Sequence, residues 1–215
     1  MKSILSTKKF SNSQKQLFLN SGLSLVEYDA INTEATDFEL PSEKIKNAIF
    51  TSKNSVKAVL GKVEVEHCFC VGKKTADLLS ENGFHIQEIT DYGKDLGEII
   101  VQKYPEESFI FFCGNKRRDE IPEILQGNKI DFKEIEVYKT SLNPKPFSQE
   151  FDGILFFSPS AVQSFTAENQ LKDVTAFCIG KTTATEAKKH TNNIIIATKP
   201  SIENVIVQVV KYFKK

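Results

Sequence analysis

The sequence predicts an α/β protein made of two similar lobes, each a parallel five-stranded sheet flanked by helices. Apolar runs of strand length alternate with segments of helical period along the 215 residues. This order is typical of parallel sheets that helices cover on both faces. In addition, segments of the first half recur in the second half at a nearly constant shift, which indicates a duplicated unit.

The alternation places ten strands along the chain. Short apolar runs predict strands at 2–6, 24–28, 48–51, 66–71, 85–89, 109–113, 131–137, 153–157, 174–179 and 193–197. Segments with apolar residues at helical spacing lie between the strands, and the clearest predicted helices are 73–80 (KKTADLLS) and 202–213 (IENVIVQVVKYF).

The duplication is visible in paired segments. Ser52 corresponds to Ser158 and Gly72 to Gly180, which are shifts of 106 and 108 residues. Each pair lies in a longer match: 49–59 with 155–165, 69–76 with 177–184, the opening strand with 109–113, and Tyr28 with Tyr138. Five strands therefore repeat in the same order as another five.

The boundary between the lobes can be drawn in two ways. A tandem arrangement would divide the chain at the turn 104–108. The polar segments 31–41 and 139–147, which contain Pro and lack either period, are the more obvious linkers. Division at both linkers gives one lobe of about 40–138 and a second made of 1–30 and about 148–215. The residues favour the linkers and leave both divisions open.

Composition and cysteine usage indicate a cytoplasmic protein. The 28 basic and 28 acidic residues cancel, so no overall charge favours nucleic acid or membrane, and any preference for anions must be local. The four cysteines (Cys68, Cys70, Cys113 and Cys178) lie in apolar strand-like runs, which is typical of reduced, buried thiols, and we expect no metal site. No leader or apolar span of about 18 residues is present, and nothing points away from a monomer.

The loops that follow the predicted strands carry the candidate binding residues. In open parallel sheets, ligands bind outside the carboxyl ends of the strands, where loops lead into helix N-termini. These loops supply hydroxyls, glycines and cations that suit an anion bound in a cleft between the lobes, although Ser and Thr there are also ordinary helix N-caps. The candidates are Ser52, Lys53, Gly72, Thr75, Gly114, Asn115, Arg117, Arg118, Ser158, Ser160, Gly180, Thr182 and Thr183.

Residues for acid–base catalysis are few. None of the three histidines lies in the strand-end loops, and no nucleophile elbow, Walker loop or dinucleotide fingerprint follows a strand. Acidic residues are also scarce at the strand ends, which disfavours a bound divalent metal. We therefore expect any chemistry to proceed by positioning and electrostatics, with Tyr138 as a candidate phenol.

Six motifs in this order resemble the uroporphyrinogen-III synthase family nearly end to end. They are 50–54 (FTSKN), 71–76 (VGKKTA), 113–122 (CGNKRRDEIP), 137–140 (VYKT), 156–162 (FFSPSAV) and 179–184 (IGKTTA). The resemblance implies a two-stranded connector between the lobes and a cofactor-free site in the cleft. It also implies the discontinuous division: 1–30 plus 148–215 as lobe one, 40–138 as lobe two, and 31–39 and 139–147 as connectors.

The family's activity accounts for the candidate residues. Its substrate, hydroxymethylbilane, is a linear tetrapyrrole with eight carboxylates, and the enzyme closes it with inversion of ring D through a spiro intermediate. By resemblance, Tyr138 assists departure of the hydroxyl group, with a connector tyrosine packed between lobes as the alternative. By the same resemblance, the hydroxyl residues hold carboxylates, the three glycines let the main chain approach the substrate, and Lys53, Arg117 and Arg118 add positive charge. Arg117 and Arg118 are expected to open a helix, with one of them facing solvent. The chain departs from the family at Lys8, where arginine is common, and at Lys53, which is commonly not basic.

Two other functions fit the same pattern. A two-lobed cytosolic protein that binds or senses a small anion without catalysis would also need hinged lobes and cation-rich loops. A sugar-phosphate or nucleotide enzyme could use the same architecture, but it would need a carboxylate or histidine at a strand end.

Overall fold

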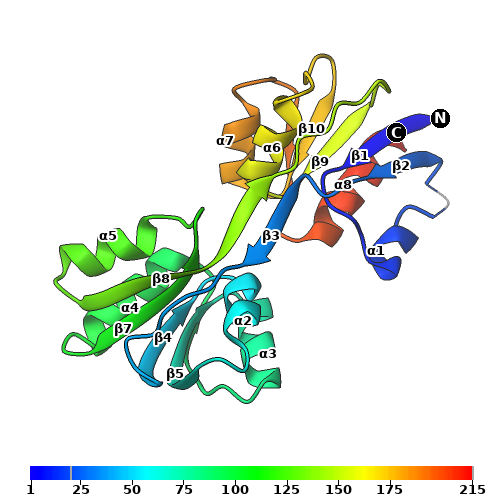
Figure 1. Cartoon of the computed structure of the whole chain (residues 1–215). Helices are drawn as coiled ribbons and strands as arrows, with labels where there is room; N and C mark the ends of the chain where they lie inside the picture. The colour runs from blue at the N-terminus through cyan, green and yellow to red at the C-terminus, as the bar shows by residue number, and fades with distance from the viewer. Residues whose placement is uncertain (20, 215) are drawn as a thin grey trace. The chain divides into compact units, whose positions relative to one another are not determined.

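The computed structural model describes residues 1–19 and 21–214. They form two compact units, Met1–Asn32 with Ser141–Lys215 (unit 1) and Thr33–Thr140 (unit 2). Each unit contains one sheet with helices on both faces (Figure 1), which confirms the predicted α/β class. Among the described residues, no helix has the length and apolar character needed to cross a membrane.

Unit 1 contains a five-stranded parallel sheet in the order β11-β10-β9-β1-β2. Its strands are β1 (Lys2–Ser6), β2 (Leu23–Glu27), β9 (Gly153–Phe156), β10 (Thr175–Cys178) and β11 (Ile194–Ile196). Its helices are α1 (Asn12–Gln16), α6 (Pro159–Thr166), α7 (Lys181–Ala187) and α8 (Ile202–Phe213).

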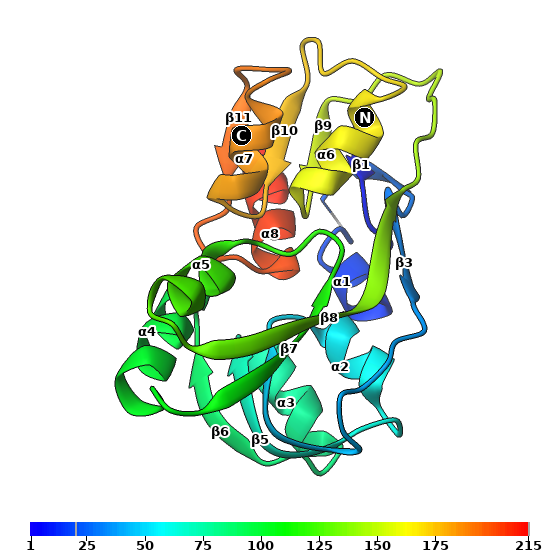
Figure 2. The same ribbon diagram turned by 60° about the vertical axis from the view of Figure 1, so that its left-hand side comes forward.

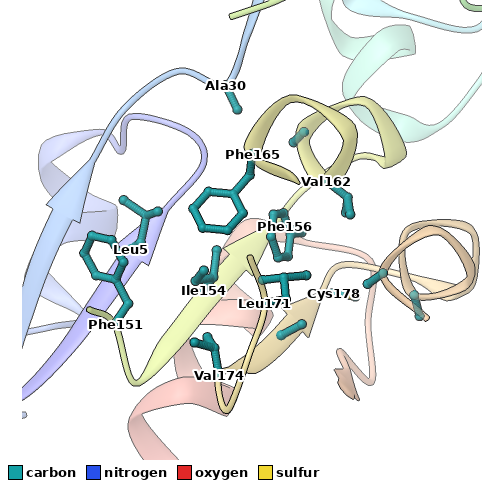
Figure 3. Packing of buried hydrophobic residues seen from close by; sticks show 14 of the residues in the cluster. Leu5, Ala30, Phe151, Ile154, Phe156, Val162, Phe165, Leu171, Val174 and Cys178 are labelled. Carbon is teal, nitrogen blue, oxygen red and sulfur yellow. The ribbon is translucent and has the colours of Figure 1, made fainter. Parts of the chain in front are cut away.

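Two apolar layers cover the faces of this sheet. In β9, Ile154 and Phe156 point toward α6 and α7, where they pack with Val162 and Phe165 of α6 (Figure 3). Leu155 points to the other face and packs in the layer of α8. Because both faces are covered, the strand is a continuous apolar run rather than an alternating one, and this is the signal that predicted it.

Unit 2 contains a six-stranded sheet in the order β3-β8-β7-β4-β5-β6. Its strands are β3 (Ile31–Ala35), β4 (Lys44–Phe50), β5 (Glu64–Val71), β6 (Ile86–Thr90), β7 (Ser108–Gly114) and β8 (Asp131–Leu142). Its helices are α2 (Lys53–Val59), α3 (Lys73–Glu81), α4 (Gly93–Lys103) and α5 (Glu120–Gly127). Helices α2 and α3 cover one face, and α4 and α5 cover the other (Figure 2).

The two sheets have the same strand order under the sequence repeat. The repeat relates β1 to β7, β2 to β8, β9 to β4, β10 to β5 and β11 to β6. Unit 1 read as β2-β1-β9-β10-β11 therefore matches unit 2 read as β8-β7-β4-β5-β6. The duplicated sequence thus forms the same sheet twice, once from a continuous segment and once from the two ends of the chain.

The residue pattern alone predicted a linker at 31–41, and this expectation was wrong for the strand β3. Four of its five residues are exposed, so no apolar period marks it. The Thr36 amide donates to the Val137 carbonyl at 3.0 Å, which continues the pairing of β3 with β8. Strand β8 also extends to Leu142, beyond the predicted end at 137. No helix separates β2 from β3 or β8 from β9.

Candidate functional site

Each sheet has one point where the order of its strands changes direction. In unit 2, the chain runs from β4 outward to β5 and β6, and then returns to β7 and continues outward to β8 on the other side. The carboxyl ends of β4 and β7 therefore lie side by side at the switch point, which is where open parallel sheets bind ligands. In unit 1 the equivalent point lies between β9 and β1.

A cavity of about 300 Å³ lies at the switch point of unit 2. Four of the sequence-predicted site residues line it together, namely Ser52, Arg117, Arg118 and Tyr138. Thr51, Lys116 and Glu120 line it as well. Thr51 and Lys116 could have been found from the sequence, because they lie in the same strand-end loops as the predicted residues.

A larger cavity, of about 990 Å³, lies at the opposite edge of the unit 1 sheet. It is lined by residues at the amino ends of strands, such as Lys2 and Thr175. Its acidic lining residues (Glu150, Asp152, Glu168 and Asp173) outnumber its basic ones (Lys2 and Lys172). Because strand order and charge both disfavour an anion there, we take the smaller cavity as the candidate site despite its size.

Ser52 and Ser158 occupy equivalent positions at the start of α2 and α6. Both have extended backbone angles, and each side-chain oxygen accepts a hydrogen bond at 3.1 Å, from the Asn54 amide and the Ala161 amide respectively. Both are therefore N-caps. A hydroxyl that accepts from its own helix still has its proton to donate, so capping and ligand binding are compatible. Ser160, in the first turn of α6, is partly exposed.

Gly72 and Gly180 are the equivalent N-caps of α3 and α7, and neither has a side-chain cap. Gly72 has φ +85°, a conformation that favours glycine, whereas Gly180 is extended. The threonines that follow differ in exposure: Thr75 and Thr183 are buried against their sheets, and Thr182 is exposed. The main-chain amide of Thr75 already donates to the Gly72 carbonyl at 2.9 Å.

Arg117 and Arg118 lie in the loop before α5, so the expectation that they open a helix was wrong. The helix begins at Glu120 after the N-cap Asp119, and negative charge is favourable at this end of a helix. Arg117 Nε donates to Glu134 Oε2 at 2.8 Å, and Nη1 pairs with Asp119. These hydrogen bonds raise the pKa of Arg117, and its charge is already matched by carboxylates of its own unit. Arg118 is exposed, as expected for one of the pair.

Lys53 and Lys116 are two further cations in the loops after β4 and β7. Both side chains are exposed, and neither forms an ion pair with another residue in the described part of the chain. Lys116 borders the cavity directly, whereas Lys53 opens α2 next to the cap Ser52. In unit 1, Lys8 is likewise exposed after the end of β1.

Tyr138 lies on β8 at an irregularity of the sheet. Cys113 of β7 pairs with Glu136, and the next residue, Gly114, pairs with Tyr138, so that Val137 is an extra residue. The Tyr138 ring is partly buried and packs against the apolar layer beneath α2 and α3. Asn115 holds the neighbouring main chain: its Oδ1 accepts from the Thr140 amide at 2.8 Å, and its Nδ2 donates to the Thr140 carbonyl at 3.3 Å.

Cys68, Cys70, Cys178 and the histidines lie outside the lining of this cavity, whereas Cys113 directly precedes Gly114 and interacts with Arg117. All four cysteines are free thiols in the sheet cores. Burial raises the pKa of Cys68 and Cys178 to about 12 and that of Cys70 and Cys113 to about 11. The Nδ1 atoms of His67 and His85 are 3.4 Å apart on β5 and just before β6. Among residues 1–19 and 21–214, no three metal-ligating side chains are grouped in a way that could hold an ion.

The fold and the candidate site define a two-unit α/β protein with hydroxyls, amides and cations at the switch points of its sheets. The model of the family described as uroporphyrinogen-III synthase HemD matches residues 14–206. The chain therefore belongs to the uroporphyrinogen-III synthase HemD family, as its motifs predicted.

Individual relatives agree with this assignment. The porphyrin biosynthesis protein HemD of Ruminiclostridium josui is 31% identical over 151 residues, which are 63% of this chain and 30% of that protein. The chain thus matches less than a third of the length of this curated relative.

Two crystal structures share the fold. Uroporphyrinogen-III synthetase from Helicobacter pylori has a TM-score of 0.75 and 20% identity, with 99% of this chain and 100% of that chain covered. A mutant uroporphyrinogen III synthase from the extremely thermophilic bacterium Thermus thermophilus has a TM-score of 0.65 and 13% identity, with 99% and 98% covered.

Proposed function

We propose that this chain converts hydroxymethylbilane into uroporphyrinogen III, closing the ring with inversion of ring D and without a cofactor. The observation that carries the proposal is the cavity at the switch point of unit 2. There the phenol of Tyr138, the cap Ser52 and the ammonium-bearing Lys116 line one space of about 300 Å³. A proton donor beside cations is what a reaction on a polycarboxylate requires when no cofactor takes part.

The carboxylates of the bilane bind to the strand-end loops of each unit. Ser52 and Ser158 are oriented by their own helices, so each presents its remaining hydroxyl proton to an acetate or propionate group. The uncapped amides after Gly72 and Gly180 provide further donors at positive helix ends. Lys116 supplies the charge in the cavity of unit 2, because Arg117 is already paired with Glu134. Lys53 and Arg118 in unit 2, and Ser160 and Thr182 in unit 1, are further candidates for carboxylate binding in the strand-end loops of their own units.

Tyr138 acts at the start of the reaction. Its hydroxyl donates a hydrogen bond or a proton to the hydroxymethyl oxygen of ring A, so that this oxygen departs as water and leaves an electrophilic azafulvene. Ring D attacks through its substituted carbon and forms a spiro intermediate, which fragments and closes again with ring D inverted. Unguided closure joins the ends directly and gives the type I isomer, so the protein's main task is to hold the bilane in the bent conformation.

The location, oligomeric state, lobe boundaries and ligand class that we propose are those predicted from the sequence. We propose a cytoplasmic monomer whose lobes are 1–30 with 148–215 and 40–138, connected by 31–39 and 139–147. Its ligand is the small-molecule bilane, without nucleic acid or membrane as partners.

The isomer composition of the product tests this function. Fresh hydroxymethylbilane is supplied, the products are oxidised, and the type I and type III porphyrins are separated. We expect type III as the main product, with Tyr138→Phe slowing its formation about ten-fold or more. Tyr212→Phe is the control, because Tyr212 is an exposed tyrosine on α8. Type I alone at the spontaneous rate would favour a protein that binds or senses an anion without catalysis.

A further inference from the structure

The extra residue in β8 determines where Tyr138 lies. Without Val137 as an extra residue, Val137 would lie opposite Gly114 and Tyr138 would lie one residue beyond it. The irregularity brings Tyr138 opposite Gly114 instead, at the last residue of β7. Such bulges redirect one side chain near functional sites, and the bulged strand needs other contacts to hold it in place.

Gly114 provides the space that the phenol occupies. A Cβ atom at this residue would lie 2.9 Å from Cε1 of Tyr138 and closer still to Cζ and Cε2. Real Cβ atoms do not approach carbon atoms so closely, so the hydroxyl-bearing end of the ring rests on the main chain of Gly114. A glycine is required here by the ring of Tyr138, since Gly114 is not among the residues with a positive φ.

Asn115 holds strand β8 at Tyr138 and at Thr140, two residues further along. Its main-chain amide donates to the Tyr138 carbonyl at 3.3 Å, and its side-chain amide makes the two hydrogen bonds to Thr140. Asn115 itself is exposed, so no apolar packing explains the choice of an amide side chain there. An amide offers one donor and one acceptor on the same edge, which matches a main-chain N–H and C=O.

We infer that Gly114 and Asn115 are positioning residues for the Tyr138 hydroxyl, rather than groups that hold a carboxylate. The sequence had placed both with the substrate-binding residues. The effect on kcat rests on the proposed function, because the position of the Tyr138 hydroxyl affects the rate only if that hydroxyl takes part in the reaction. The structural part of the inference concerns Tyr138 alone: the two residues hold the ring in one orientation, at the geometry from which it can donate.

The kinetic test compares Asn115→Ala and Gly114→Ala with matched controls. We expect kcat for type III formation to fall roughly ten-fold in each, with KM changed by less than about two-fold, because the proposed carboxylate-binding side chains of Ser52, Lys116 and Ser158 are unchanged. The controls are Asn82→Ala, which removes a side-chain bond to the Leu78 carbonyl at 2.8 Å, and Gly127→Ala, where an added Cβ meets nothing. A rise in KM at constant kcat would overturn the inference and return both residues to substrate binding.

A double-mutant cycle separates positioning from general damage. In a Tyr138→Phe background the hydroxyl is gone, so Asn115→Ala should then cost less than about two-fold in kcat. A further ten-fold loss in that background would show that Asn115 acts on something other than the phenol. If Tyr138→Phe alone leaves the rate unchanged, Tyr138 has no catalytic role. The remaining claim, that Gly114 and Asn115 orient the Tyr138 ring, is then tested by NMR.

An NMR measurement tests that structural part without activity. With ¹³C-labelled tyrosine rings, the Tyr138 signal is assigned from its loss in Tyr138→Phe. We expect this signal to shift or broaden in Asn115→Ala and, where the variant folds, in Gly114→Ala, while Asn82→Ala leaves it unchanged. An unchanged Tyr138 signal in Asn115→Ala would overturn the inference even if no type III isomer is formed by the wild-type protein.

Discussion

Two tyrosines at equivalent positions of the repeat differ in their surroundings. Tyr138 borders the cavity of unit 2, whereas Tyr28, its counterpart in unit 1, is 5% exposed and packs edge-on against Phe147 at 5.1 Å between ring centres. Among the described residues, the Tyr28 hydroxyl has no hydrogen-bond partner. The duplication therefore produced one phenol at a site and one inside a core.

We expect Tyr28→Phe to leave the free energy of unfolding unchanged or to raise it by about 1 kcal/mol. Removal of a buried hydroxyl that makes no hydrogen bond removes a desolvation cost and keeps the ring contacts. Urea unfolding of the variant and the wild-type protein would measure the difference. A loss of more than about 1 kcal/mol would mean that a bound water molecule satisfies the hydroxyl.

Buried thiols and Tyr28 should make the protein less stable at alkaline pH. Burial raises the pKa of Tyr28 from 10.0 to about 12 and that of the thiols from 9.0 to about 11 or 12. The unfolded chain releases these protons at lower pH than the folded chain does. The contribution of these groups to the free energy of unfolding is therefore fully present below about pH 9 and is lost as the pH rises toward 12. Urea midpoints at pH 8 and pH 10.5 would measure this loss, and equal midpoints would contradict it.

At the scale of elements, helix caps and site residues coincide. The caps Ser52 and Ser158 were found from the sequence because a Ser between a predicted strand and a predicted helix is typical of a helix N-cap. The ion pair between Arg117 and Glu134 was not found from the sequence, because Glu134 lies on β8 and becomes a neighbour of Arg117 only when β7 and β8 pair. The strand β3 was missed for a related reason, since a polar edge strand is recognised by its pairing with β8 and has no apolar period of its own.

Substitutions at Ser158 can separate its two roles. Asp caps a helix about as well as Ser, but it cannot donate to a carboxylate and repels it. We therefore expect Ser158→Asp to keep the free energy of unfolding and to raise KM, whereas Ser158→Ala should cost about 1 kcal/mol. Urea unfolding and steady-state kinetics measure the two effects.

Ser201 provides the control for that experiment. It caps α8 through the Asn204 amide, outside the switch point of unit 1. Ser201→Asp should change neither stability nor KM. If Ser158→Asp behaves in the same way as Ser201→Asp, Ser158 is a cap without a part in binding.

At the scale of the whole molecule, each unit contains its own cores. The two apolar layers of unit 2 consist of residues from 38 to 138. In unit 1, the two segments of the chain meet where the Asn143 amide donates a hydrogen bond to the Ala30 carbonyl at 2.9 Å. The repeat in the sequence was enough to predict two similar sheets, but the division between them needed the strand pairing or the family resemblance.

We expect each unit to fold alone. A fragment of residues 31–142 contains β3, β8 and both cores of unit 2, and a chain in which a short Gly-rich linker joins Ala30 to Asn143 contains those of unit 1. Because the main chains at that junction are already hydrogen-bonded, the linker closes a short gap. Cooperative urea unfolding of both proteins would support the expectation, and a fragment without a transition would show that its core depends on the other unit.

Because unit 1 is made of two segments on either side of unit 2, the order of synthesis determines which unit can fold first. Strand β1 emerges first, yet it lies in the middle of its sheet, between β2 and β9, and β9 begins only at Gly153. Unit 2 is complete before that point, so the second unit in the chain is the first to fold, contrary to the usual order of domains. Until then, β1 has only β2 as a neighbour, and Ile4 and Leu5 lack the residues of β9, α6 and α8 that bury them. We expect holdase chaperones to bind a nascent chain that is stalled before residue 153.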